Sequence, residues 1–175
     1  DSQTWEPFTP AKAAELPQEC LQKVVEPQRI VWQISGQLSN DGDGKPQTLF
    51  STMGQNGALP NFWAGIGGPH NNFKLVLSPQ PNRSPHTWAG PSLPVDKPFS
   101  MQFAIHSGMG PGGLLWRWDD NHPWSTLIGA SPWGVERLIW PHHWAIGQIN
   151  GHQPFRGTDL KITWHHQAYS LHDYL

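Results

Sequence analysis

The sequence predicts one all-β domain built as a sandwich or barrel. Gly and Pro number 18 each among 175 residues, and this density interrupts helices and favours short strands joined by tight loops. Apolar and polar residues alternate in several segments, as strands with one buried face require. The chain also holds 11 Trp, 7 Phe and 2 Tyr. Rings of this size either fill the space between two sheets or lie exposed as flat platforms.

The first 27 residues follow a different pattern. Thr9 and Pro10 precede the segment 11–16, Ala-Lys-Ala-Ala-Glu-Leu, which predicts a short helix with a capping residue and with Pro in its first turn. The segment 17–25 adds one or two further turns, and Pro27 ends them. We therefore expect residues 1–27 to form a lead-in with short helical turns and residues 28–175 to form the β-domain.

From residue 29 onward the apolar pattern has a period of two. Strands are expected at 30–34, 48–51, 62–66, 73–77, 99–106, 114–118 and 160–165. The clearest is 99–106, where alternate residues from Phe99 to Ile105 are apolar. After 160–165, a short polar turn and a second strand at 169–173 predict a closing hairpin. The Pro-rich stretch 79–98 is too interrupted for a central strand and predicts an exposed excursion.

Composition and charge exclude several classes of function. The formal net charge is −2, and the 11 Lys and Arg residues are spread singly along the chain. Proteins that bind nucleic acid normally carry a basic stripe, so we expect no nucleic-acid partner. No apolar run approaches the roughly 18 residues of a membrane span. Cys20 is the only cysteine, so the chain contains no internal disulfide.

Three segments carry a resemblance to a known family. They are Gln-Thr-Leu-Phe-Ser-Thr at 47–52, Gly-Gly-Leu-Leu-Trp at 112–116, and the closing pair at 159–164 and 169–173. These segments resemble the laminin-G-like branch of the concanavalin A-like jelly rolls. The resemblance implies a jelly-roll β-sandwich whose outward sheet or loop rim binds glycans, sometimes through a calcium ion. The chain departs from the family pattern where His172 takes an aromatic or apolar position.

Some polysaccharide lyases share the same general sandwich. One lyase group carries a Gln-Ile-His motif on an inner strand, and this sequence has Gln33, Ile34 and Ser35, with Ser in the place of the catalytic His. The sequence also has no counterpart of that group's Arg-rich motif or of its Tyr/Lys-rich motif. The resemblance therefore does not imply lyase chemistry of that style.

The segment 117–124 concentrates polar and aromatic residues. Trp118 and Trp124 are candidates for stacking on a sugar ring, and Arg117, Asp119 and Asp120 are candidates for bonding its hydroxyl groups. Arg117 is also suited to a bidentate contact with a uronate carboxylate. The alternative is a loop tip in which the indole rings cover the core edge and the acids cap a turn.

A second dense patch covers residues 133–144. Trp133 is a candidate stacking platform, and Glu136 is a candidate for hydroxyl bonding. Glu136 together with Asp119 or Asp120 would also supply the paired carboxylates of a glycoside hydrolase. A salt bridge of Glu136 with Arg137 or Arg117 is the structural alternative.

Metal sites are a further hypothesis. Adjacent residues of a strand point to opposite faces, so His142–His143 and His165–His166 each offer one ligand at most to a shared zinc or copper site. The sequence Asp-Gly-Asp-Gly at 41–44 resembles a calcium turn, but the later Glu of an EF-hand loop is missing. A structural calcium ion and a plain Asp-Gly turn both remain open.

We expect a secreted, periplasmic or cell-surface domain that recognises a polysaccharide or other glycan. One alternative is an enzyme on the same scaffold that uses Glu136, a His and either Tyr169 or Tyr174. A second alternative is a structural or interaction domain of a larger exported protein. The glycan hypothesis requires that indole rings within 116–144 lie open to water beside polar groups.

Overall fold

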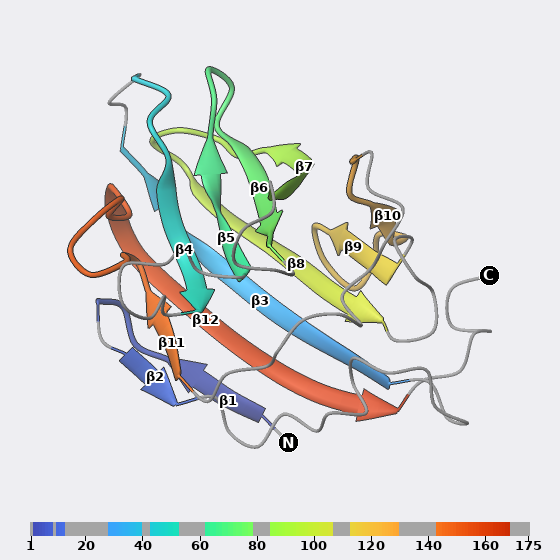
Figure 1. The fold of residues 1–175 in the computed structure, drawn as a ribbon. Helices are drawn as coiled ribbons and strands as arrows, with labels where there is room; N and C mark the ends of the chain where they lie inside the picture. The colour runs from blue at the N-terminus through green and yellow to red at the C-terminus, as the bar shows by residue number, and fades with distance from the viewer. Residues whose placement is uncertain are drawn as a thin grey trace.

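The computed structural model describes residues 2–8, 10–12, 28–39, 43–52, 62–78, 85–106, 113–129 and 143–168. These residues form twelve strands and no α-helix. The strands lie in two six-stranded sheets, and every pair of neighbouring strands is antiparallel. The all-β sandwich predicted from the sequence is confirmed (Figure 1).

The first sheet, sheet A, contains the longest strands of the domain. In spatial order its strands are β1 (Ser2–Trp5), β12 (Gly157–Ala168), β3 (Gln28–Leu38), β8 (Pro98–His106), β9 (Leu114–Arg117) and β10 (Ser125–Thr126). Figure 1 shows β12, β3 and β8 side by side. Strands distant in the sequence are therefore neighbours, and they create one broad face.

The second sheet, sheet B, covers one face of sheet A. In spatial order its strands are β2 (Pro10–Lys12), β11 (His143–Ile146), β4 (Gln47–Thr52), β5 (Phe62–Gly67), β6 (Asn72–Leu77) and β7 (His86–Ser92). Strands β4 to β7 are consecutive in the chain and pair in order, whereas β11 joins β4 from far along the sequence.

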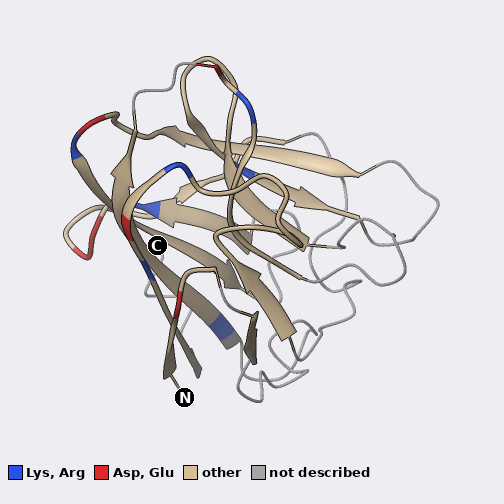
Figure 2. Cartoon of the chain, turned by 90° about the vertical axis from the view of Figure 1, so that its left-hand side faces the viewer, with Lys and Arg blue, Asp and Glu red and all other residues tan. Residues whose placement is uncertain are grey.

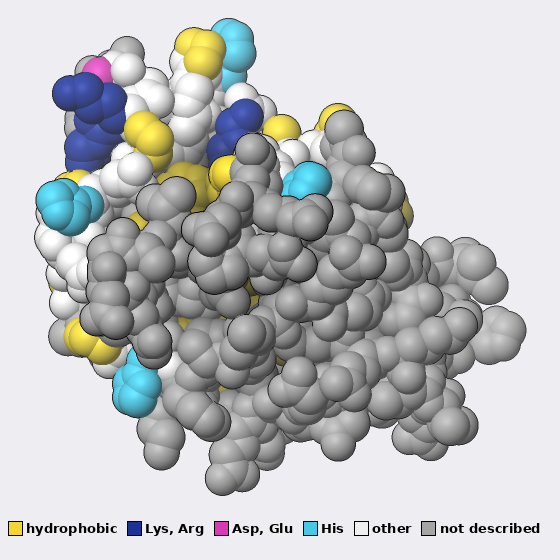
Figure 3. Space-filling model, in the orientation of Figure 1, with side chains coloured by type: hydrophobic (Ala, Val, Ile, Leu, Met, Phe, Trp, Pro, Cys, Tyr) yellow, Lys and Arg dark blue, Asp and Glu magenta, His cyan; other side chains and the backbone are white. Residues whose placement is uncertain are grey.

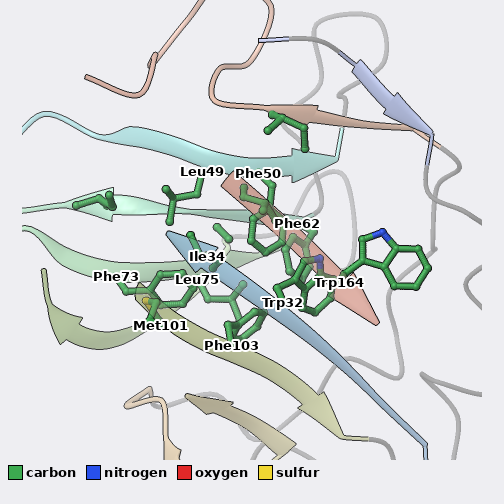
Figure 4. Close-up of a cluster of buried hydrophobic side chains, with 14 of the residues drawn as sticks. Trp32, Ile34, Leu49, Phe50, Phe62, Phe73, Leu75, Met101, Phe103 and Trp164 are labelled. Carbon is green, nitrogen blue, oxygen red and sulfur yellow. The ribbon is translucent and has the colours of Figure 1, made fainter. Parts of the chain in front are cut away.

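Aromatic rings fill the space between the sheets. Trp32 of β3 packs with Phe103 of β8 at 5.4 Å between ring centroids and with Phe50 of β4 at 5.2 Å. Phe62 meets Trp144 edge-on at 5.1 Å. Figure 4 shows this cluster between the strands of the two sheets. Burial of such rings is the main source of stability for a sandwich of this size.

Most of the described Trp residues are buried in the folded domain. Six are buried, at most 9 % exposed: Trp5, Trp32, Trp63, Trp88, Trp144 and Trp164. Three are half-buried: Trp116, Trp118 and Trp124. Trp63 differs from the core rings because it lies across Gly65, where an added Cβ would come within 2.3 Å of the indole. The Trp surplus is therefore explained largely by packing.

The N-terminal segment corrects one expectation. The predicted helix at 11–16 begins inside β2, where Ala11 pairs with Trp144 of β11, and Ser2–Trp5 pairs with β12. Capping residues and Ala content are local signals, and pairing with a sheet edge overrides them. Residues 13–27, which carry the rest of the helical prediction and Cys20, lie outside the described residues.

Two further expectations change in detail. The stretch 79–98 contains β7, an edge strand that tolerates Pro91 and buries Trp88 to 2 % exposure. The polar turn expected before residue 169 belongs to β12, which extends to Ala168 opposite Gln28. The predicted partner strand at 169–173 lies outside the described residues.

Candidate functional site

The candidate site lies on the face of sheet A that points away from sheet B. Gln33 of β3 stands opposite Gln102 of β8, and Gln102 stands opposite Arg117 of β9. Their chain neighbours Trp32 and Phe103 point into the core. Since successive side chains of a strand alternate between faces, the three polar residues form a row on the outer face.

Arg117 is held in this row by two side chains. Its Nε donates to Oε1 of Gln102 at 2.6 Å, and its Nη2 donates to Oδ1 of Asp120 at 3.1 Å. Gln102 Nε2 donates to the same Asp120 oxygen at 2.7 Å. The three groups close a triangle that fixes the guanidinium plane. The Asp120 side chain is 81 % exposed, whereas that of Arg117 is 19 % exposed.

Trp124 completes the arrangement. The Arg117 Cζ lies 4.2 Å from the centroid of the Trp124 ring, which is a close cation–π contact. His106 of β8 meets the same ring edge-on, with 5.8 Å between centroids. We call Arg117, Gln102, Asp120 and Trp124 the Arg117 cluster. It combines an aromatic ring, a cation, an anion and an amide within one small area.

His106 forms the inner edge of this area. It is fully buried, and burial lowers the pKa of its imidazole to about 3, with further lowering from the charges of Arg29 and Arg117. The ring is therefore neutral at physiological pH. It adds no second positive charge beside Arg117, and it supports Trp124 as an apolar wall.

Asp119 points into its own loop. Its Oδ1 lies 2.7 Å from Nδ1 of His122 and accepts from the Asn121 backbone N–H at 2.8 Å. These hydrogen bonds, that with His122 first, lower the pKa of the Asp119 carboxyl. Such a local pattern is typical of an acid that stabilises a turn. The contacts of Asp119 therefore agree with the alternative in which the acids of this segment cap a turn.

Trp118 turns away from the Arg117 cluster. It packs on the core and meets Trp116 edge-on at 5.2 Å. Its remaining surface lines an open cavity of 470 Å³ between the end of β7 and the start of β8. Trp118 is therefore part of a different surface from Trp124, although the two were grouped together in the sequence.

The structure thus divides the residues predicted for the site. Arg117, Asp120 and Trp124 lie together, and Asp119 and Trp118 lie apart from them. Trp133 and Glu136 lie outside the described residues, as do Tyr169 and Tyr174. Trp144 lies in the core at 0 % exposure.

Gln102 belongs to the site but was not predicted for it. The alternation in 99–106 assigned it to the polar face, which is correct. Its position opposite Arg117 depends on the register between β8 and β9, and no feature of a single strand encodes that register.

Charge on the described surface is sparse. Figure 2 shows Lys, Arg, Asp and Glu at a few places along strands and loops, with acidic and basic segments side by side on two loops, and Figure 3 shows Lys and Arg at separate places on one face. No group of three or more His, Cys, Asp or Glu residues within the described ranges is arranged to hold a metal ion. The described part of the chain also contains no helix long and apolar enough to cross a membrane.

Comparison with known proteins places the fold. No protein-family model and no curated protein matches the sequence. Solved structures do match. The CBM40 domain of the Ruminococcus gnavus IT-sialidase bound to α2,3-sialyllactose has a TM-score of 0.57 at 12 % identity, over 99 % of this chain and 94 % of that one. The same domain bound to α2,6-sialyllactose has a TM-score of 0.53 at 14 % identity, over 85 % and 81 %.

These similarities concern the backbone alone. At 12 % and 14 % identity, they establish that the chain has the two-sheet sandwich fold of these solved structures, and they assign no residue a role. The all-β sandwich expected from the sequence agrees with this fold, and no family model tests the laminin-G-like resemblance.

Proposed function

We propose that the protein is a glycan-binding domain whose binding face is the outer surface of sheet A around the Arg117 cluster. The observation that carries this proposal is the stacking of the Arg117 guanidinium on Trp124, with Gln102 and Asp120 fixing its plane. Prearranged groups of this kind reduce the ordering cost of binding.

The chemistry of the cluster suits a sugar with an acidic group. The Arg117 Nη1 atom has no hydrogen-bond partner among the described residues, and guanidinium N–H groups pair well with carboxylates. Asp120 is exposed and accepts hydroxyl hydrogen bonds, and the Trp124 ring offers an apolar surface for sugar C–H groups. The similar modules bound to sialyllactose, a trisaccharide with one carboxylate, support the same class of ligand.

The test is a glycan panel containing α2,3- and α2,6-sialyllactose, uronate oligosaccharides and neutral oligosaccharides, measured by calorimetry. The double variant R117A/W124A is expected to lose binding of the acidic glycans. The matched control is K74A/T87A, which changes two residues of β6 and β7 in sheet B. Retained binding in R117A/W124A, or no binding of any glycan by the unmodified protein, would overturn the proposal.

The two alternatives rest on other residues. An enzyme on this scaffold would use Glu136, a His and either Tyr169 or Tyr174, and Glu136 and both Tyr residues lie outside the described residues. Asp119 and Asp120, its other candidate acids, already bind His122 and Arg117. A domain that serves only as an interaction module would need no such cluster. Glycans occur mainly outside the cell, so we also propose that the protein is secreted, periplasmic or attached to the cell surface.

A further inference from the structure

We propose that the cavity beside Trp118 is a second subsite, which binds a neutral sugar unit of the same glycan that the Arg117 cluster binds through its acidic unit. This inference rests on the glycan-binding function proposed above. It assigns a role to the only predicted stacking residue that the described structure places away from the Arg117 cluster and beside a cavity.

The walls of the cavity are apolar and uncharged. Trp118, Phe99, Pro94 and Pro98 supply ring surfaces, and no described residue that lines the cavity carries a charge. Its volume of 470 Å³ falls within the roughly 300–1,000 Å³ of small-ligand pockets. A charged sugar would lose hydration here without gaining a partner. The cavity therefore favours a neutral ring.

Two hydroxyl groups lie at the rim. Ser92 Oγ donates to the backbone oxygen of His70, so its lone pairs are available as acceptors. Ser100 Oγ accepts from Gln33 Nε2 at 2.7 Å, and its proton has no acceptor among the described residues. The rim thus offers one acceptor and one donor. Sugar hydroxyls, which both donate and accept, match this pair.

The cavity is already formed before any ligand binds. Leu93 N–H donates to the Asn71 carbonyl at 2.9 Å, and Asp96 N–H donates to the Leu38 carbonyl at 2.9 Å. These bonds hold the 93–96 connection against the β5–β6 turn and the end of β3. A preformed wall binds without the entropy cost of ordering a loop.

The cavity and the Arg117 cluster approach each other along β8, where Ser100 lines the cavity and Gln102 belongs to the cluster. Ser100 and Gln102 lie on the same face of β8, about 6.6 Å apart because a strand rises about 3.3 Å per residue. Trp118 directly follows Arg117 at the end of β9. Neighbouring units of one oligosaccharide can therefore reach both places.

The test uses the indole N–H signals of ¹⁵N-labelled protein, with the Trp118 signal assigned from W118F. Lactose, cellobiose and maltose serve as neutral probes. At least one of them is expected to shift the Trp118 signal and leave that of Trp124 unchanged. S100F, which places a ring at the cavity mouth on an exposed position, is expected to abolish the shift, and T87F on β7 is the matched control. S100A is expected to weaken binding about two- to tenfold.

The outcomes separate the two proposals. If sialyllactose shifts the Trp124 signal but no glycan shifts the Trp118 signal, the subsite is wrong and the proposed function stands. A neutral-sugar shift that persists in folded S100F also overturns the subsite. If no glycan shifts either signal, both proposals fail.

Discussion

The domain contains two Arg–Asp pairs, with N···O distances of 2.5 Å and 3.1 Å, that lie in different surroundings. Arg156 Nη1 donates to Asp43 Oδ2 at 2.5 Å, and its Nη2 donates to the Lys45 carbonyl at 3.2 Å. This pair joins the segment before β12 to the segment before β4. Arg117 instead pairs with Asp120 three residues away and stacks on Trp124.

The difference shows what separates a structural ion pair from a candidate binding group. The Arg156 pair links residues 113 positions apart, so its hydrogen bonds close a long loop. The Arg117 pair closes almost no loop, because its partners are local or on the adjacent strand. Its hydrogen bonds therefore do little to hold distant parts of the chain together. They leave an aromatic, charged surface open to solvent. We expect Arg156 to act on stability and Arg117 to act on binding.

The largest expected effect is a loss of folding stability at acid pH. It comes from His106, which lies beside the Arg117 cluster. His106 has a pKa of about 3 in the folded protein against an ordinary 6.5. The unfolded state therefore binds the proton first, so stability is complete above pH 6.5 and falls as the pH drops toward 3. The loss is on the order of 4–5 kcal/mol at the acid end, and it is measured by urea unfolding from pH 7 to pH 3.

Two variants sharpen this acid prediction. H106L is expected to flatten the slope between pH 6.5 and pH 3. Asp43, whose pKa is lowered to about 2 mainly by the Arg156 hydrogen bond, contributes stability above its ordinary 3.8 that is lost only between about 3.8 and 2. D43N should therefore lower stability by a constant amount above about pH 4 and flatten the slope only between about pH 3.8 and pH 2. If the free energy of unfolding of H106L falls with pH as steeply as that of the unmodified protein, His106 does not cause the loss of stability in acid.

The second prediction exchanges the two arginines. R117A is expected to weaken binding of an acidic glycan by about 30-fold, or roughly 2 kcal/mol, and to leave the free energy of unfolding within about 0.5 kcal/mol. R156A is expected to lower that free energy by about 1 kcal/mol with unchanged binding. Calorimetry and urea unfolding measure the two quantities. The reverse pattern would mean that the two pairs have been assigned the wrong roles.

The third prediction concerns the ring beneath Arg117. W124A removes the stacking surface and the cation–π contact, and it is expected to weaken glycan binding about tenfold, or 1.4 kcal/mol. W124F keeps an aromatic face and should recover most of the affinity. W88F, in the buried edge of sheet B, is the matched control and should affect stability only. Equal binding by W124A and the unmodified protein would exclude Trp124 from the site.

The smallest effect is expected for Asp120. Its side chain is 81 % exposed, and exposed ion pairs contribute little. D120N keeps the hydrogen bonds from Gln102 and Arg117, so stability should not change measurably. Binding of an acidic glycan should improve about two- to threefold at low salt, because a like charge is removed. D120N keeps a side chain that hydrogen-bonds sugar hydroxyls, so weaker binding would mean that the Asp120 charge strengthens those bonds more than it repels the sugar carboxylate.

The sequence predicted the long strands within the sheets more accurately than the short strands at the sheet edges. Alternation in 99–106 and in 160–165 gave strands whose apolar faces now form the core, such as Phe103 and Ile162. The N-terminal helix was wrong over Pro10–Lys12 because a tertiary partner, β11, decides the conformation there. The alternation of apolar and polar residues shows which face of a strand is buried. It does not show which distant strand will pair with that strand.

The candidate site was predicted in part for a related reason. Arg117, Asp120 and Trp124 were found because they crowd one short segment, and Gln102 was missed because it reaches them from another strand. Trp118 follows Arg117 directly and therefore points to the opposite side. Trp118 and Trp124 lie on different surfaces because successive residues of a strand point to opposite faces. Closeness in the sequence alone does not reveal this separation.

A crystal structure of the protein with α2,3-sialyllactose tests the central claim most directly. We expect the sugar on the outer face of sheet A, with its carboxylate at the Arg117 guanidinium and a sugar ring against Trp124. A ligand seated on sheet B, or one that leaves Arg117 and Trp124 uncovered while binding elsewhere, would contradict the account.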